Sequence, residues 1–298
     1  MTAAIETANL TKRYGRRAAL SECTLSVPTG KVVGLVGPNG AGKTTLLHLA
    51  VGLLEPSAGS IEVLGHRPAE GPEQLARVGF VAQNTPVYAG VSVADHLRFG
   101  SWMNPTWDRA LASKRVEQLG LDPKQKAATL SGGQRAQLAL TLAIAKRPEV
   151  LILDEPVASL DPLARREFLQ ALMAVVVDHG VSVVLSSHLV ADLERVCDYL
   201  VVLVASRVQV AGEIDELLAV HHRLSAPRRD GLRLPSDWEV VEQSGTDRQS
   251  TLIVRHEEPI LDPAWTVQQL GLEDLVLAYM SSTRVVRSTA PTLVGARP

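Results

Sequence analysis

The chain has 298 residues and a formal net charge of −2, with 46% hydrophobic and only 4% aromatic residues. This length allows one large domain with its own core and a smaller second one. The near-neutral charge provides no broad basic field for nucleic acid, and no apolar run is long enough to span a bilayer. Cys23 and Cys197 lie far apart and are expected to be reduced core thiols.

Short apolar runs alternate with helical patterns from the start of the chain to about Gly212. Buried strands are expected at 31–36, 78–82, 149–153, 181–186 and 199–204, the last of the series. Helices are expected at 43–54, 162–179 and 188–196, and residues 92–126 are mostly helical in pattern, with Asn104-Pro105 interrupting them. This order predicts an α/β fold with a mainly parallel sheet and helices on both of its faces.

The pattern changes after about Leu218. Residues 221–237 are rich in Arg, Pro and His and are expected to be a linker, 238–242 and 251–255 a small hairpin, and 272–280 a short amphipathic helix. We therefore expect a first domain over residues 1–218, a small accessory domain over 219–280, and a flexible tail over 281–298, which is rich in Ser, Thr, Arg and Pro.

A glycine-rich loop follows the strand expected at 31–36 and fits the pattern G-x-x-x-x-G-K-[ST]. Glycines let the backbone wrap an anion, and the helix N-terminus that follows directs its positive dipole at it. Lys43 is expected to reach the β- and γ-phosphates of ATP, and the Thr44 hydroxyl to bind Mg²⁺. The expected nucleotide contacts are Gly37, Pro38, Asn39, Gly40, Ala41, Gly42, Lys43, Thr44 and Thr45.

Two acids follow the apolar run 150–153, at the end of the strand that faces the ligand crevice in a parallel sheet. Asp154 is a candidate partner for Mg²⁺, directly or through water, because hard cations take oxygen ligands. Glu155 is a candidate general base for the attacking water. The alternative for either acid is a helix cap or a solvated loop residue.

The segment Leu130-Ser131-Gly132-Gly133-Gln134 precedes a helix-forming run, 135–146. A serine and two glycines at this place form either an ordinary helix cap or a second phosphate-binding N-terminus. One nucleotide site does not need two such segments, whereas two sites shared between two chains do.

These motifs together resemble the ABC ATPases over roughly residues 5–215, because LSGGQ about twenty residues before the acidic strand is their signature. The resemblance implies that Tyr14 stacks on adenine, that Gln83 contacts Mg²⁺ and water, and that His188 contacts the γ-phosphate. It also implies that Asp161, in the loop Ser159-Leu160-Asp161, communicates across a dimer. Taken alone, these side chains are a surface tyrosine, a loop glutamine and a structural histidine. Val157 departs from the family pattern outside the catalytic set.

The resemblance further implies a P-loop NTPase of ABC type with a helical subdomain at about 84–146. Two such subunits, identical or homologous, sandwich two ATP molecules with Mg²⁺, and drive a separate integral-membrane permease at the cytoplasmic face of the cell membrane. The implied catalytic residues are Lys43, Gln83, Glu155 and His188, and the metal ligands Thr44, Gln83 and Asp154. Across the dimer, nucleotide contacts come from Ser131, Gly132, Gly133, Gln134 and Asp161.

The direction of transport has a weaker indication. Residues 212–218 (GEIDELL) and 272–277 (LEDLVL) resemble the tail of ATPases that serve ABC-2-type export permeases, so export is expected. The alternative is a non-transport ABC ATPase that acts on nucleic acid or the ribosome. Such proteins carry long coiled coils, zinc cysteines or two cassettes, and this sequence shows none of these.

Overall fold

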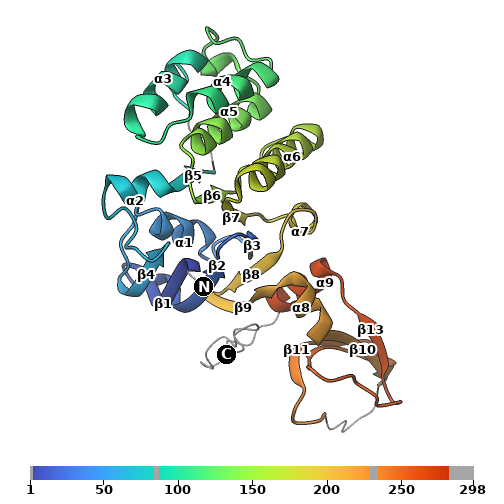
Figure 1. Ribbon diagram of the computed structural model, residues 1–298. Coiled ribbons are helices and arrows are strands. Elements are labelled where there is room, and N and C mark those ends of the chain that lie inside the picture. Colours follow the sequence, from blue (N-terminus) through green and yellow to red (C-terminus); the bar gives the residue numbers. More distant parts are fainter. Residues whose placement is uncertain (1–2, 84–86, 229–233, 282–298) are drawn as a thin grey trace.

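The structure is a computed structural model that describes residues 3–83, 87–228 and 234–281. Its main sheet has six strands in the order β5-β6-β7-β3-β8-β9 (Figure 1). The strands are β3 (Val32–Val36), β5 (Val78–Val81), β6 (Val150–Asp154), β7 (Ser182–Ser186), β8 (Tyr199–Val204) and β9 (Arg207–Glu213). The first five are parallel, and β9 pairs antiparallel with β8. The mainly parallel α/β sheet is confirmed, but β8 is not the last strand.

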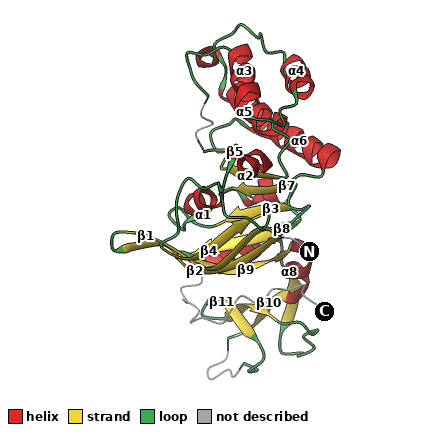
Figure 2. Cartoon of the chain, turned by 60° about the vertical axis from the view of Figure 1, so that its left-hand side comes forward, coloured by secondary structure: helices red, strands yellow, loops and turns green. Residues whose placement is uncertain are grey.

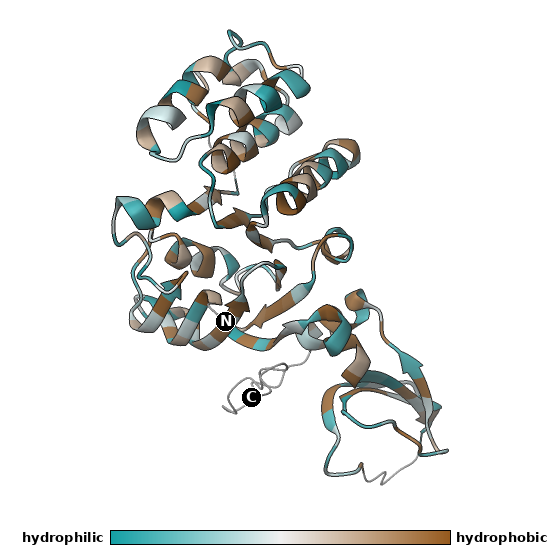
Figure 3. Cartoon of the chain, in the orientation of Figure 1, coloured by the Kyte–Doolittle hydropathy of each residue, from teal (hydrophilic) through white to brown (hydrophobic). Residues whose placement is uncertain are grey.

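Successive side chains of each strand point to opposite faces of this sheet, and both faces are covered. Leu151 and Leu153 pack into one core cluster, and Val150 and Ile152 into the other. The first face carries α5 (Gly132–Ala145), α6 (Pro162–His179), α7 (Val190–Leu193) and α9 (Leu272–Ser281). The sheet strands are predominantly hydrophobic, as burial on both faces requires (Figure 3).

The second face is covered by α1 (Lys43–Ala50) and by a three-stranded antiparallel sheet of order β2-β1-β4. These strands are β1 (Ala3–Tyr14), β2 (Arg17–Pro28) and β4 (Ala58–Val63). The sequence-based expectation of helices on both faces is therefore right for one face and incomplete for the other. Helix α1 ends at Ala50 rather than Leu54, because Gly52 adopts a left-handed backbone.

A helical part extends from the edge of the main sheet (Figure 2). Its elements are α3 (Val93–Met103), α4 (Arg109–Gln118), the short 3₁₀ turn Ala127–Thr129 and the start of α5, whereas α2 (Pro72–Arg77) lies against β5 of the main sheet. Ser92 and Asp108 cap α3 and α4 through their side chains, and Asn104 ends α3 as the Asn-Pro pair predicts. A separate small core holds α3, α4 and α5 together.

The C-terminal part begins with α8 (Ile214–Val220) and forms a four-stranded antiparallel sheet of order β11-β12-β10-β13. Its strands are β10 (His221–Pro227), β11 (Glu239–Gly245), β12 (Gln249–Arg255) and β13 (Thr266–Gln269). The expected hairpin is confirmed by the β11–β12 pairing. The expected linker is wrong at its start, because His221, Leu224 and Ala226 are buried in β10.

The last helix, α9, leaves this small sheet and returns to the main core. Leu272, Leu275, Val276 and Tyr279 all belong to the large cluster under the parallel sheet. Nothing is described beyond Ser281, so the expected flexible tail lies outside the described residues except for its first position.

The two cysteines are free thiols, as expected. Burial raises the pKa of both Cys23 and Cys197, so both stay protonated at neutral pH.

Candidate active site

The loop between β3 and α1 has the tight backbone of a phosphate cradle. A Cβ on Gly37 would lie 2.1 Å from the carbonyl oxygen of Leu203, and one on Gly42 would lie 2.4 Å from that of Ala19. Gly42 also has a φ of +111°, which an L side chain rarely adopts. Only glycine fits at these two positions. The loop ends directly at the N-terminus of α1, where free backbone N–H groups favour an anion.

Lys43 lies at the floor of this loop with 6% of its surface exposed. Its Nζ donates to the carbonyl oxygens of Gly37, at 2.7 Å, and Pro38, at 3.4 Å. The same atom is 3.7 Å from Glu155 Oε1. The ammonium is thus held among oxygen atoms, a setting in which phosphate oxygens would offer it stronger, charge-assisted hydrogen bonds.

Asp154 is fully buried at the end of β6. Its Oδ1 accepts a 2.8 Å hydrogen bond from Ser186, whereas Oδ2 has no partner among the described residues. A buried carboxylate oxygen without a partner is costly, so this atom suits a cation or a water molecule. No group of three or more His, Cys, Asp or Glu in the described chain could hold a metal by itself. A cation here would also need oxygens from Thr44, Gln83 and a phosphate, the ligand type that Mg²⁺ prefers.

Glu155 contacts several of the other candidate catalytic residues. Its φ is +46°, an uncommon backbone for glutamate that costs on the order of 1–2 kcal/mol. Its N–H donates to Ser186 Oγ at 2.8 Å. Its Oε2 accepts from Gln83 Nε2 at 3.4 Å and lies 3.2 Å from His188 Nδ1. Strained, over-determined backbone of this kind gathers at functional sites.

Lys43 and Glu155 line a cavity of about 670 Å³, a volume that suits a nucleotide-sized ligand, whereas the buried Asp154 is not among its lining residues. The expected residues that line it are Tyr14, Asn39, Gly40, Gly42, Lys43, Thr44, Thr45, Gln83, Glu155 and His188. Tyr14 is half exposed at the rim, with Lys12 Nζ 5.5 Å from its ring centre. Lys12 lies over this ring, so a base would stack on the part of the ring that remains exposed.

Sequence reasoning missed three residues of this site. Arg17 and Ala19, on β2, line the cavity, and Ser186 links the two acids from β7. Arg17 and Ala19 were missed because the sequence pattern did not predict the antiparallel sheet that contains β2. Ser186 could have been found, because it ends the strand next to the acidic one and so lies at the same edge of the sheet.

The segment 130–134 lies elsewhere. Ser131 Oγ accepts from the Gln134 N–H at 3.1 Å, and Gln134 Oε1 accepts from the Ser131 N–H at 2.9 Å, so the two form a capping box at the start of α5. Among the described residues, neither these side chains nor Gly132 and Gly133 line the cavity. Asp161 also lies outside the cavity and caps α6 by accepting from two backbone N–H groups.

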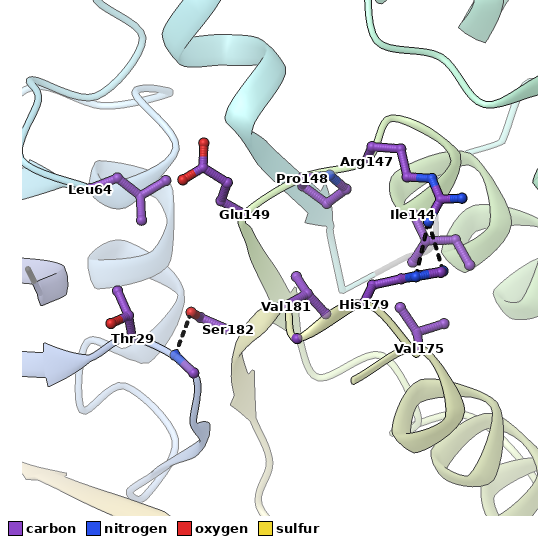
Figure 4. Close-up of a pocket in the computed structure, with 12 residues that line it drawn as sticks. Thr29, Leu64, Ile144, Arg147, Pro148, Glu149, Val175, His179, Val181 and Ser182 are labelled. Carbon is purple, nitrogen blue, oxygen red and sulfur yellow. Dashed lines mark hydrogen bonds between the residues drawn. The ribbon is translucent and has the colours of Figure 1, made fainter. Parts of the chain in front are cut away.

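A second cavity, of about 620 Å³, lies at the opposite end of the parallel strands (Figure 4). Arg147 contacts the ring of His179 there and also binds Asp108. Glu149 is paired with Arg77, which lies outside this set of lining residues. The charged groups of this cavity are engaged with protein partners. It shares no lining residue with the phosphate-loop cavity, which gathers the expected nucleotide-binding residues and is the candidate site.

Residues 20–158 match the ABC transporter family. The Nod factor export ATP-binding protein I of Cupriavidus pinatubonensis is 36% identical over 229 residues, which cover 73% of this chain and 69% of that protein. The sulfate/thiosulfate import ATP-binding protein CysA of Mycobacterium tuberculosis is 36% identical over 217 residues, covering 71% of this chain and 62% of that protein.

Solved structures agree with these sequence matches. An ATP-binding subunit of an ABC transporter superposes with a TM-score of 0.65 at 29% identity, covering 72% of this chain and 91% of that one. The protein cbiO1 of Clostridium perfringens, part of the ABC transporter complex cbiONQ, has a TM-score of 0.62 at 25% identity and covers 72% and 89%. The chain therefore belongs to the ABC transporter family, as an ATP-binding subunit of the ABC ATPase type.

Proposed function

We propose that this chain hydrolyses ATP as one of two paired ATPase subunits and drives transport through a separate membrane permease. The observation that supports the pairing is the separation, within one chain, of the two helix N-termini to which we assign phosphate binding. Helix α1 opens into the cavity at Lys43, whereas α5 is capped by Ser131, outside it. A second subunit, identical or homologous, would complete each site by placing its own Ser131 and Gly133 against the γ-phosphate.

The side chains of the cavity would divide the work of hydrolysis. Tyr14 would stack on adenine, and Lys43 would bind the phosphates, which draws its ammonium away from Glu155. Glu155 would then accept a proton from the attacking water, an effect worth on the order of 10²- to 10⁴-fold in rate. His188 and Gln83, both within reach of that carboxylate, would hold it and the water in place.

Mg²⁺ would be held by Asp154, Thr44 and Gln83 and would neutralise charge on the phosphates. The buried, unpartnered Oδ2 of Asp154 supports this assignment, since it offers an oxygen ligand that has no other partner among the described residues.

We assign the contact with the permease to the helical subdomain, at about residues 84–146. Trp102 and Met103, at the end of α3, are 70% and 81% exposed, and Tyr88 and Phe99 nearby are exposed as well. Large exposed apolar side chains on one element are typical of a protein interface. None of the described helices has the length and apolarity to cross a membrane. Such a permease would hold the chain at the cytoplasmic face of the cell membrane.

We further propose export. The relatives include both an export and an import subunit at 36% identity, so identity alone does not decide the direction. The two tail segments that resemble export ATPases pack together, because α8 contacts α9, and Leu217, Leu272 and Leu275 belong to the same core cluster. This contact supports reading them as a single unit, in which the first segment precedes the accessory domain proposed for residues 219–280 and the second forms its last helix.

Co-purification from detergent-solubilised membranes tests the permease. We expect the tagged chain to retain an integral-membrane protein with about six spans of about 20 residues each. Trp102→Ala and Met103→Ala should lose this partner and keep ATP hydrolysis, whereas Val177→Ala, an equally exposed position on α6, should keep both. Retention of the partner by the α3 variants would contradict the assigned contact. Recovery of ribosomes or nucleic acid in place of a membrane protein would favour a non-transport ABC ATPase.

A further inference from the structure

We propose, building on the paired ATPase described above, that Arg165 and Asp192 are positioning residues that connect the signature segment (residues 130–134) to His188. Arg165 lies on the second turn of α6 and Asp192 on α7. Arg165 Nε is 3.7 Å from Asp192 Oδ2, and the two side chains are 23% and 12% exposed. The pair bridges two elements that follow two different loops of the site.

The geometry of this pair is unusual for buried charges. Arg165 Nε and Asp192 Oδ2 are both buried and have no hydrogen-bond partner within the described chain. At 3.7 Å they attract as charges but lie beyond hydrogen-bond distance, so their desolvation is poorly compensated. A small approach of α6 and α7 would give a charge-assisted hydrogen bond. The pair therefore favours an arrangement in which the two helices lie closer together.

On one side, α6 packs directly on the signature segment. A Cβ on Gly133 would lie 2.9 Å from the Ala164 Cβ, and one on Gly132 would lie 3.8 Å from the Leu160 side chain. Arg165 Nη2 also donates to the Leu160 carbonyl oxygen at 3.4 Å. A contact with no space for a methyl group transmits displacement. A shift of the signature segment would therefore carry Arg165 with it.

On the other side, α7 is a single turn that starts two residues after His188. The Asp192 N–H donates to the Leu189 carbonyl oxygen at 3.3 Å, which ties Asp192 to the loop that carries His188. His188 in turn meets Glu155 at 3.2 Å. When the nucleotide of a partner subunit docks on the signature segment, the distance between Arg165 and Asp192 would shorten and His188 would be repositioned. Binding of ATP at one site would therefore change the position of a catalytic residue at the other.

A double-mutant cycle on the full chain tests this coupling, with Arg165→Gln, Asp192→Asn and both together. We expect each single variant to lower kcat for ATP about ten- to hundredfold while the affinity for labelled ATP is unchanged, because the phosphate loop is untouched. The double variant should lose no more than either single one, and Arg165→Lys should recover part of the rate. Arg166→Gln and Glu194→Gln, at exposed neighbouring positions, should match the wild type.

The outcomes are distinguishable. Wild-type kcat in the single variants, or losses that add up in the double variant, would overturn the coupling. If the single variants lose ATP affinity and melting temperature together with kcat, the coupling is also overturned, because such losses indicate an ion pair that only stabilises the fold. If Arg165→Gln does not fold, Asp192→Asn and Arg165→Lys carry the same comparison. A wild-type chain that binds ATP without hydrolysing it would instead contradict the proposed function.

Discussion

The hydroxyl of Ser186 donates to Asp154 Oδ1 at 2.8 Å and accepts the backbone N–H of Glu155 at 2.8 Å. One buried side chain thus fixes both acids of the site, the first through its carboxylate and the second through its backbone. This relationship depends on the pairing of β6 with β7, which places Ser186 opposite Asp154.

Ser186→Ala should lower kcat about ten- to hundredfold, because Glu155 and Asp154 lose the group that places them. Ser186→Thr, which keeps the hydroxyl, should retain most of the rate. The matched control is Ser182→Ala, which removes a buried hydroxyl that binds the Gly30 N–H at the other end of β7. It should cost similar stability and leave kcat unchanged. Steady-state phosphate release and thermal melting measure both effects, and equal kcat losses at the two serines would remove Ser186 from this role.

Glu155→Gln should keep ATP binding and lower turnover by about 10²- to 10⁴-fold, because the amide keeps the shape of the side chain but cannot accept the proton. Binding of labelled ATP and steady-state hydrolysis separate the two effects. Glu149→Gln, just before the start of the same strand, should leave hydrolysis unchanged. Near-normal turnover by the Glu155 variant would exclude it as the general base.

Lys43→Ala should weaken ATP binding itself by about 10- to 100-fold, since a buried charge-assisted contact to phosphate is lost. Equilibrium binding of labelled ATP measures this change. Lys31→Ala removes a more exposed lysine that is paired with Glu213, and should bind ATP like the wild type. Unchanged affinity in the Lys43 variant would contradict the assignment of the phosphate cradle.

Much of the parallel sheet could be predicted from the sequence, because a strand buried on both faces is a continuous apolar run. Helix α6 was predicted with its observed bounds, since Asp161-Pro162 starts it and Gly180, with a φ of +62°, ends it. The antiparallel sheet was not predicted. Strand β1 has several register irregularities, and its buried residues Ala4, Ile5, Thr7 and Leu10 do not follow a regular alternation.

Contacts between distant residues account for the other misses. The segment expected to be a linker becomes β10, and its His221 is buried because the ring contacts Tyr279, 58 residues away. The Ser186 link and the Arg165–Asp192 pair likewise join residues on separate elements, and no local spacing in the sequence predicts these contacts.

His221 makes the stability of the C-terminal part depend on pH. Burial lowers the pKa of His221 to about 4, below the ordinary value of 6.5, because desolvation disfavours the charged ring more than the hydrogen bond to the Leu217 carbonyl oxygen favours it. Its contribution is therefore complete above pH 6.5 and lost as the pH falls toward 4. We expect roughly 2–3 kcal/mol less stability from this group at pH 4.5 than at pH 7.

Urea unfolding of the wild type and His221→Gln at the two pH values measures this contribution. The variant should be less stable at pH 7 but should lose less on acidification, and His66→Gln, at an exposed position, should behave like the wild type. The same pH dependence in all three proteins would contradict the role of His221.

ATP should bring two chains together, because Lys43 and Ser131 mark the two helix N-termini to which we assign phosphate binding, and only the first opens into the cavity of this chain. Glu155→Gln should show this best, since its ATP persists. Adding Ser131→Arg should block the dimer by placing bulk and an unmatched charge where the γ-phosphate of the partner must dock. Light scattering with and without Mg-ATP measures the size of each variant.

Monomeric ATP binding should survive Ser131→Arg, because Lys43 and Tyr14 lie in a cavity that Ser131 does not line. The substitution also removes a helix cap, which costs about 1 kcal/mol. Ser92→Arg, in the same Glu155→Gln background, removes the corresponding cap of α3 and controls for that loss. It should still form the dimer. An ATP-dependent dimer that persists in the Ser131 variant would show that this segment does not reach the nucleotide of the other subunit. Loss of the dimer in both cap variants would mean that helix stability, rather than phosphate docking, controls assembly.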